Sequence, residues 1–144
     1  MSRAQLCILI CLISLSKGKL RRSYHSHHLP ICPPELNIED QAARVSLIFT
    51  GIVERVYWFK LRSYLAIIQV KQVIKGDPSL SQNRVILEGS INFCKPGVRE
   101  KEKGIFFANL SDSGRLKLSF GVLRNSSNNI NKISASIKGK VPLN

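Results

Sequence analysis

Apolar and polar residues alternate over 45–59 and 115–122, and this alternation predicts β-strands. Three further segments rich in β-branched, aromatic or other apolar side chains, 64–74, 84–88 and 104–109, are also predicted strands. Gly51 lies inside the first segment, where a glycine indicates a bulge or a sharp bend. The pattern therefore favours a small sheet that curls on itself.

Two segments with helical features flank the predicted strands. Residues 35–44 carry acidic side chains in their first turns, where the helix dipole favours negative charge. Near the C-terminus Ile130, Ile133 and Ile137 recur at helical spacing, and residues 125–128 before them are good N-cap types. We therefore expect a mainly β fold, a five-stranded OB-type barrel flanked by an N-terminal and a C-terminal helix. An immunoglobulin-like sandwich is the alternative, although it needs more strands and a Trp between two cysteines.

The first eighteen residues have the features of a secretory signal peptide. Arg3 gives a positive start, an almost unbroken apolar run covers 6–15, and small residues then precede a basic patch. This run is too short to span a bilayer of about 30 Å; a buried element or a retained anchor is the alternative. We expect a signal peptide over 1–18, a basic flexible arm over 19–31, the domain over 32–138 and a tail over 139–144.

Composition narrows the class of protein. The 144 residues are 44% hydrophobic, which suits one globular domain with a leader and excludes a Rossmann domain with a substrate domain, a TIM barrel or a kinase. Lys and Arg number 22 against nine Asp and Glu, a net charge of +13 that favours polyanionic partners. No carboxylate pairs with a histidine or a second carboxylate. We expect a binding module with no catalytic residue, no cofactor and no metal site.

The cysteines divide between the leader and the domain. Cys7 and Cys11 lie in the apolar run and would leave with it, whereas Cys32 and Cys94 remain. Two thiols in an oxidising compartment predict one disulfide, which the chain-entropy model values at about 4 kcal/mol for a loop of this length. A catalytic thiol is a weaker alternative because neither cysteine has a suitable histidine partner.

Two kinds of surface feature are candidate sites. Asn109 and Asn125 each begin an N-x-S/T triplet, the acceptor pattern for an N-linked glycan. A cationic surface on a secreted protein suits heparan sulfate or heparin, and the candidate residues are Lys19, Arg21, Arg22, Arg115 and Lys117. A basic OB barrel also suits nucleic acid, but the leader argues against it. We expect no nucleic-acid partner and no membrane insertion.

Several short stretches carry a family resemblance through their order and spacing. They are Cys32-Pro33-Pro34-Glu35, residues 50–54, Val70 through Ile74-Lys75-Gly76, Cys94 before a basic loop, and residues 105–109. Over roughly 32–137 this order resembles the N-terminal agrin (NtA) domain family. The resemblance implies an OB barrel flanked by helices, related in shape to tissue inhibitors of metalloproteinases. It also implies adhesion to basement membrane through the coiled-coil arm of laminin.

The resemblance assigns residues as well. Cys32 and Cys94 fall on a disulfide of the family pattern, and the apolar residues that would face laminin are Val122, Ile130, Ile133 and Ile137. The chain is thus expected to be a secreted adhesion module of the extracellular matrix that binds laminin through its C-terminal helical segment. The alternative is a glycosaminoglycan-binding or metalloproteinase-inhibitor-like protein, and inhibition would require processing immediately before Cys32.

Overall fold

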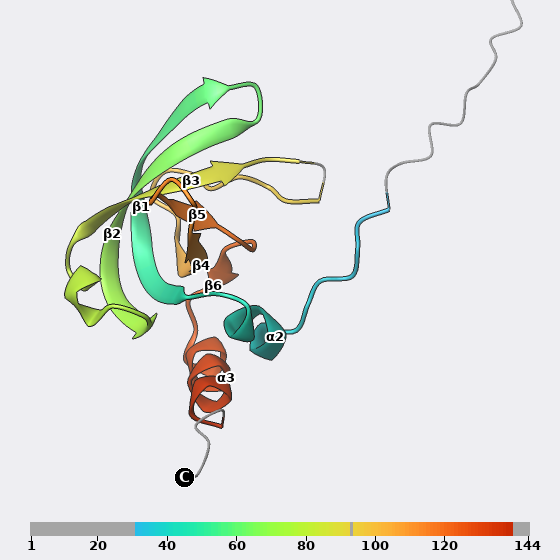
Figure 1. Ribbon diagram of the computed structural model, residues 1–144, viewed down its shortest axis with the longest axis vertical. Coiled ribbons are helices and arrows are strands. Elements are labelled where there is room, and N and C mark those ends of the chain that lie inside the picture. The colour runs from blue at the N-terminus through green and yellow to red at the C-terminus, as the bar shows by residue number, and fades with distance from the viewer. Residues whose placement is uncertain (1–30, 93, 140–144) are drawn as a thin grey trace, which may run out of the picture. The chain divides into compact units, whose positions relative to one another are not determined.

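The computed structural model describes residues 31–92 and 94–139 (Figure 1). The helix α2 (Ile38–Ala43) comes first, then β1 (Leu47–Lys60) and β2 (Ser63–Lys75). A short 3-10 turn, η1 (Pro78–Leu80), leads to β3 (Arg84–Ser90), β4 (Lys103–Leu110), β5 (Leu116–Leu118), β6 (Leu123–Arg124) and finally α3 (Ser127–Lys138). The predicted signal peptide, and with it Lys19, Arg21 and Arg22 of the arm, lie outside the described residues.

The strands close into a barrel. Their order is β1-β2-β3-β5-β4, and β4 pairs back onto β1. The pairing of β3 with β5 is parallel, and the other pairings are antiparallel. The predicted five-stranded OB-type barrel with a helix at either end is therefore confirmed. The strand predicted over 115–122 is shorter in the structure, where β5 covers only 116–118 and the short strand β6 follows after 122.

Two hydrophobic clusters lie on opposite faces of the sheet. One fills the barrel, where Phe49 and Phe106 stack with ring centroids 5.3 Å apart. The other lies between the outside of the sheet and the helices, and its buried members are Ala42, Val45, Ile48, Ile105, Phe107 and Ile133. Alternate residues of β1 and β4 thus point into different clusters, as the period of two requires.

Glycine is needed where β1 bends. A Cβ on Gly51 would lie 2.7 Å from the Ile68 Cγ2 atom and 2.9 Å from the Gln69 carbonyl oxygen. The register between β1 and β2 shifts between Thr50 and Gly51, so the predicted bend is present there. Larger side chains would push β2 away at the point where the strand turns around the barrel.

Two further contacts hold the N-terminal segment. The Lys75 amine donates to the carbonyls of Ala42 and Val45, at 2.8 and 2.6 Å, where a cation also complements the end of α2. The predicted disulfide is present between Cys32 and Cys94, with their Cα atoms 5.4 Å apart. It joins the segment before α2 to the loop between β3 and β4.

Candidate partner-binding surfaces

The C-terminal helix is held by its own apolar face. Its N-cap is Ser126, whose hydroxyl accepts a hydrogen bond from the Asn129 amide at 3.3 Å. Ile133 is fully buried in the cluster between helix and sheet, and Ile130 and Ile137 are partly buried against the same cluster. The predicted helical stripe is therefore real, but its first use is to attach α3 to this domain.

Burial corrects part of the predicted laminin surface. Ile133 was expected to contact a partner, and that assignment is wrong for the folded domain because none of its surface is exposed. Val122 packs against the barrel interior, in a different cluster from the three isoleucines. Of the four predicted residues, Val122, Ile130 and Ile137 keep partly exposed surface, and Val122 lies apart from the stripe of isoleucines.

The outward side of α3 is polar and cationic. Asn131, Lys132, Ala135 and Lys138 are exposed there, and Arg124 is exposed on β6 immediately before the helix. Ser134 lies between Ile130 and Ile137 on the helix and is partly exposed. A partner that meets α3 would therefore contact the edges of two isoleucines within a basic surround.

A shallow hollow of about 100 Å³ lies between the helices. It is lined by Ala42, Ala43, Lys75, Ser136 and Ile137, and its Lys75 amine already donates to two carbonyls. Ligand pockets for drug-sized molecules usually measure roughly 300 to 1,000 Å³. The hollow is therefore too small to indicate a small-molecule site.

The expected alternation around Arg115 and Lys117 is present. Both side chains are exposed, while Leu116 and Leu118 pack partly against the barrel core. Lys117 pairs in register with Glu88 on β3, so one carboxylate lies in the neighbouring strand. These two cations remain candidates for a polyanion, with one acidic residue close to them.

The two predicted glycan acceptors have different surroundings. The Asn109 Oδ1 atom accepts from the Ser46 amide at 2.7 Å, and its Nδ2 atom donates to the Arg44 carbonyl and the Ser119 hydroxyl. Asn125 is exposed between β6 and α3. An N-linked glycan would replace one of the two Nδ2 hydrogens that Asn109 uses, whereas Asn125 has no such conflict among the contacts of the described residues.

The largest feature that the sequence interpretation missed is the end of the β1–β2 hairpin. Tyr57, Trp58, Phe59 and Leu61 are all exposed there. The available indication was the run of three aromatic residues, which interrupts the alternation of apolar and polar positions. Beneath this end, Tyr64 is fully buried, and burial raises the pKa of its hydroxyl above the ordinary value.

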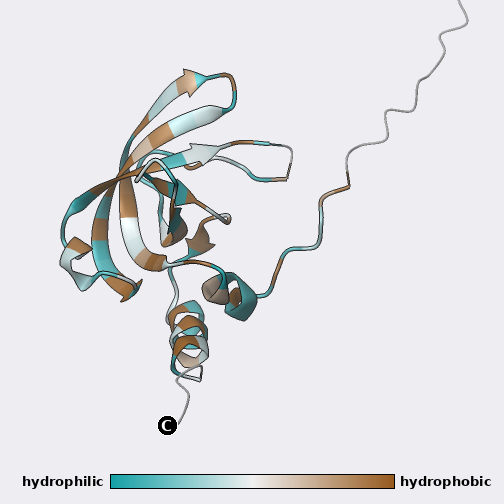
Figure 2. Ribbon diagram, in the orientation of Figure 1, coloured by the Kyte–Doolittle hydropathy of each residue, from teal (hydrophilic) through white to brown (hydrophobic). Residues whose placement is uncertain are grey.

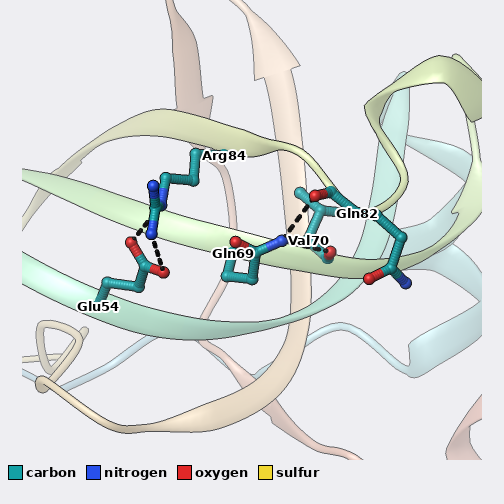
Figure 3. Close-up of polar contacts among 5 residues, drawn as sticks. All are labelled: Glu54, Gln69, Val70, Gln82 and Arg84. Atoms are coloured by element: carbon teal, nitrogen blue, oxygen red, sulfur yellow. Dashed lines mark hydrogen bonds and ion pairs between the residues drawn. The ribbon is translucent and has the colours of Figure 1, made fainter.

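Polar contacts lie on the outside of the sheet, farther along the strands from the hairpin end. Glu54 on β1 forms an ion pair with Arg84 on β3, with 2.7 Å between the Glu54 Oε2 and Arg84 Nε atoms (Figure 3). Gln69 on β2, between them, donates to the Gln82 carbonyl at 2.7 Å. Within residues 31–92 and 94–139, no three His, Cys, Asp or Glu side chains are grouped as metal ligands would be.

Comparison with known families now decides the family. The model of the agrin NtA domain family matches residues 39–140, a span that includes the whole barrel and both described helices except the first residue of α2. The chain belongs to the agrin NtA domain family. That family consists of non-enzymatic binding domains of extracellular proteins. No curated protein matches this chain.

The match agrees with the roles of the residues that carried the resemblance. Gly51, in the first strand of the family pattern, allows β1 to bend. Lys75, at the end of the second strand, holds the end of α2. These residues therefore maintain the fold and are not themselves a binding surface. None of the helices in the described segments is both long enough and apolar enough to cross a bilayer.

Proposed function

We propose that this NtA domain is a secreted adhesion module that binds the coiled-coil arm of a laminin in basement membrane. The observation that carries the proposal is the family match over 39–140, which includes the C-terminal helical segment. The chain then acts as an attachment domain in the extracellular matrix. Its specificity would reside on the outer surface of the barrel and α3, since the hollow between the helices is too small for a drug-sized ligand.

The proposed contact is the edge of α3. Ile130 and Ile137 are seven residues apart, so they lie on one line of the helix, and both are partly exposed. Val122 adds a partly exposed apolar side chain on the segment before β6. Because buried Ile133 fixes the helix on the sheet, this edge is already ordered before binding, which lowers the entropy cost of association.

Cations surround this edge and would guide the approach of an acidic partner. Arg124, Lys132 and Lys138 are exposed on β6 and α3, and the chain carries a net charge of +13. Such charges mainly raise the association rate, and salt screens them, whereas the contact of apolar side chains persists. Laminin binding by the isoleucine edge should therefore survive high salt.

A substitution that adds bulk tests this contact without removing a core side chain. Ser134→Arg places a long cation between Ile130 and Ile137, and we expect it to weaken binding to purified laminin by about tenfold or more. Gln72→Arg is the matched control because Gln72 is exposed on β2. Surface plasmon resonance measures the affinity, and circular dichroism verifies the fold. Equal binding by both variants would remove α3 as the contact.

Heparan sulfate is a second candidate partner. It is favoured by the exposed Arg115 and Lys117, which lie on the same side of β5, and by the basic arm with Lys19, Arg21 and Arg22. Binding of this kind would weaken steeply with salt. Replacing Arg115 and Lys117 with Glu should lower the salt concentration that elutes the domain from heparin. Replacing Lys71 and Arg84 with Glu should lower that concentration less.

A further inference from the structure

Exposed apolar side chains are concentrated at the end of the β1–β2 hairpin. Seven large apolar residues are exposed in the described chain, and four of them lie between Tyr57 and Leu61. Trp58 is 54% exposed and Leu61 is 100% exposed. Ile86, also exposed, lies on the neighbouring strand β3. A cluster of this kind indicates an interaction surface, since scattered single residues would need no explanation.

The hairpin end extends past the end of the pairing between β1 and β4. That pairing stops at Ile52, and the loop before β4 continues along the hairpin, where the Val56 amide donates to the Glu100 carboxylate at 3.2 Å and Gly97 lies beside the Trp58 ring. Among the described residues, the strand beyond Val56 pairs only with β2. Figure 1 shows this hairpin reaching past β4, and Figure 2 shows hydrophobic residues at its turn. On its other side β3 pairs with β2 as far as Ser63. The surface is a convex tip and not a groove.

The base of the tip is fixed. The rings of Trp58 and Tyr64 pack with centroids 5.2 Å apart, and Tyr64 is fully buried. A Cβ on Gly89 would overlap the Tyr64 ring, and Gly97 lies within contact distance of the Trp58 ring. The absence of a side chain on Gly89 thus makes room for Tyr64, against which Trp58 packs. The side of Trp58 that remains exposed is held in place before any partner arrives.

The tip is also cationic. Arg55, Lys60 and Arg62 are exposed along it, and no Asp or Glu occurs from Arg55 to Leu65. Four carboxylates lie near this region: Glu54 on β1, Glu88 on β3, and Glu100 and Glu102 before β4, where the Glu102 charge acts on Tyr64. Glu54 is paired with Arg84, Glu100 accepts the Val56 amide, and Glu88 lies opposite Leu65 on β3. The end of the hairpin therefore complements an anionic surface.

We propose that the tip of the β1–β2 hairpin docks onto the surface of an anionic phospholipid bilayer. Tyr57 and Trp58 would lie at the level of the headgroups, where such rings are enriched, and Phe59 and Leu61 would enter the acyl boundary. Lys60 and Arg62 would extend towards anionic headgroups. A convex tip suits a soft layer, whereas a protein partner would need a matching groove. The expectation of no membrane insertion is amended for these side chains alone.

The single Trp of the chain reports this contact directly, because Trp58 lies at the tip. On vesicles of equal parts phosphatidylserine and phosphatidylcholine, its fluorescence should shift to shorter wavelength and be quenched by brominated lipid. Leu61→Asp should reduce vesicle binding about tenfold, equivalent to about 1.4 kcal/mol. The matched control is Leu110→Asp, because Leu110 is 65% exposed and ends β4, beside the start of β1 and away from the tip.

Charge reversal separates specific docking from general attraction. Lys60→Glu with Arg62→Glu should abolish binding to the anionic vesicles, while Arg115→Glu with Lys117→Glu should leave most of it. An equal loss in both pairs, an equal loss in the two leucine variants, or no fluorescence shift would overturn the proposal. A laminin complex or a dimer that needs Leu61, without vesicle binding, would also overturn it. Laminin binding through α3 is independent, and the tip variants should retain it.

Discussion

The C-terminal helix and the β1–β2 hairpin tip both carry large apolar side chains beside Lys or Arg, yet only one of these surfaces is covered. On α3, Ile133 is fully buried and Ile130 is partly buried against the sheet. On the tip, Trp58 and Leu61 remain exposed. The cause is position, because α3 lies over the outside of β1 and β4 whereas the tip extends beyond the end of the pairing between β1 and β4.

This comparison separates two questions that an apolar pattern combines. The spacing of isoleucines predicts that the helix will bury one face, but it does not show whether that face packs against this domain or against a partner protein. In α3 the domain itself provides most of the cover, which leaves a narrow edge for laminin. The tip is only partly covered within the described residues, since Trp58 packs against Tyr64 but Leu61 is fully exposed, so it is the surface with more unexplained apolar area.

The largest expected difference between the two surfaces is in the free energy of unfolding when one apolar side chain of each is replaced by Ala. Ile133→Ala should lower the free energy of unfolding by about 2 to 5 kcal/mol, because it leaves a cavity under α3. Leu61→Ala should change it by less than about 0.5 kcal/mol, since an exposed side chain contributes little packing. Urea denaturation followed by circular dichroism measures both. Similar losses in the two variants would mean that the tip is also part of the folded core.

A smaller effect on stability is expected at Asn109, on the helix side of the molecule. Its side chain connects the chain before β1 to Ser119, so Asn109→Ala should cost about 1 to 3 kcal/mol through unsatisfied partners. Asn125→Ala, at an exposed position, is the control and should be nearly neutral. Thermal denaturation compares the two.

The same pair of asparagines differs in the expected modification. Mass spectrometry of protein secreted from animal cells should find a glycan on Asn125 and none on Asn109, because the folded domain uses both Nδ2 hydrogens of Asn109. A glycan on Asn109 in stably folded protein would contradict the role assigned to its hydrogen bonds.

Much of the fold could be predicted because local patterns and tertiary structure agree. Strand periodicity located the five strands of the barrel, Gly51 indicated the bend, and the residues before Ile130 indicated the start of α3. The predicted helix over 35–44 was too long at its start, because Asn37 caps the helix by accepting the Asp40 amide at 2.7 Å.

The sites were harder to predict because their character depends on distant contacts. The triplet at Asn109 does not reveal that Ser46, far away in sequence, donates to its side chain. Ile133 and Ile130 follow one helical pattern, but only the packing of α2 and the sheet decides which is hidden. The exposure of Trp58 depends on where β4 stops pairing with β1.

The smallest expected effect lies beneath the tip, at Tyr64. Its buried hydroxyl has no hydrogen-bond partner among the described residues, so Tyr64→Phe should stabilise the domain by about 1 kcal/mol at neutral pH. Burial is the main cause that raises the pKa of Tyr64, and the charge of Glu102 adds to it. The main chain of Val98 acts in the opposite direction, but its contact does not have the geometry of a hydrogen bond.

A raised pKa in the folded state makes stability fall with rising pH. Below about pH 10 Tyr64 is protonated in both states, whereas above it the unfolded chain releases the proton first and gains stability relative to the fold. The advantage of Tyr64→Phe over the unaltered protein should therefore grow above pH 10. Urea midpoints measured across alkaline pH test this, and parallel curves for Tyr64→Phe and the unaltered protein would show that Tyr64 is not secluded from solvent.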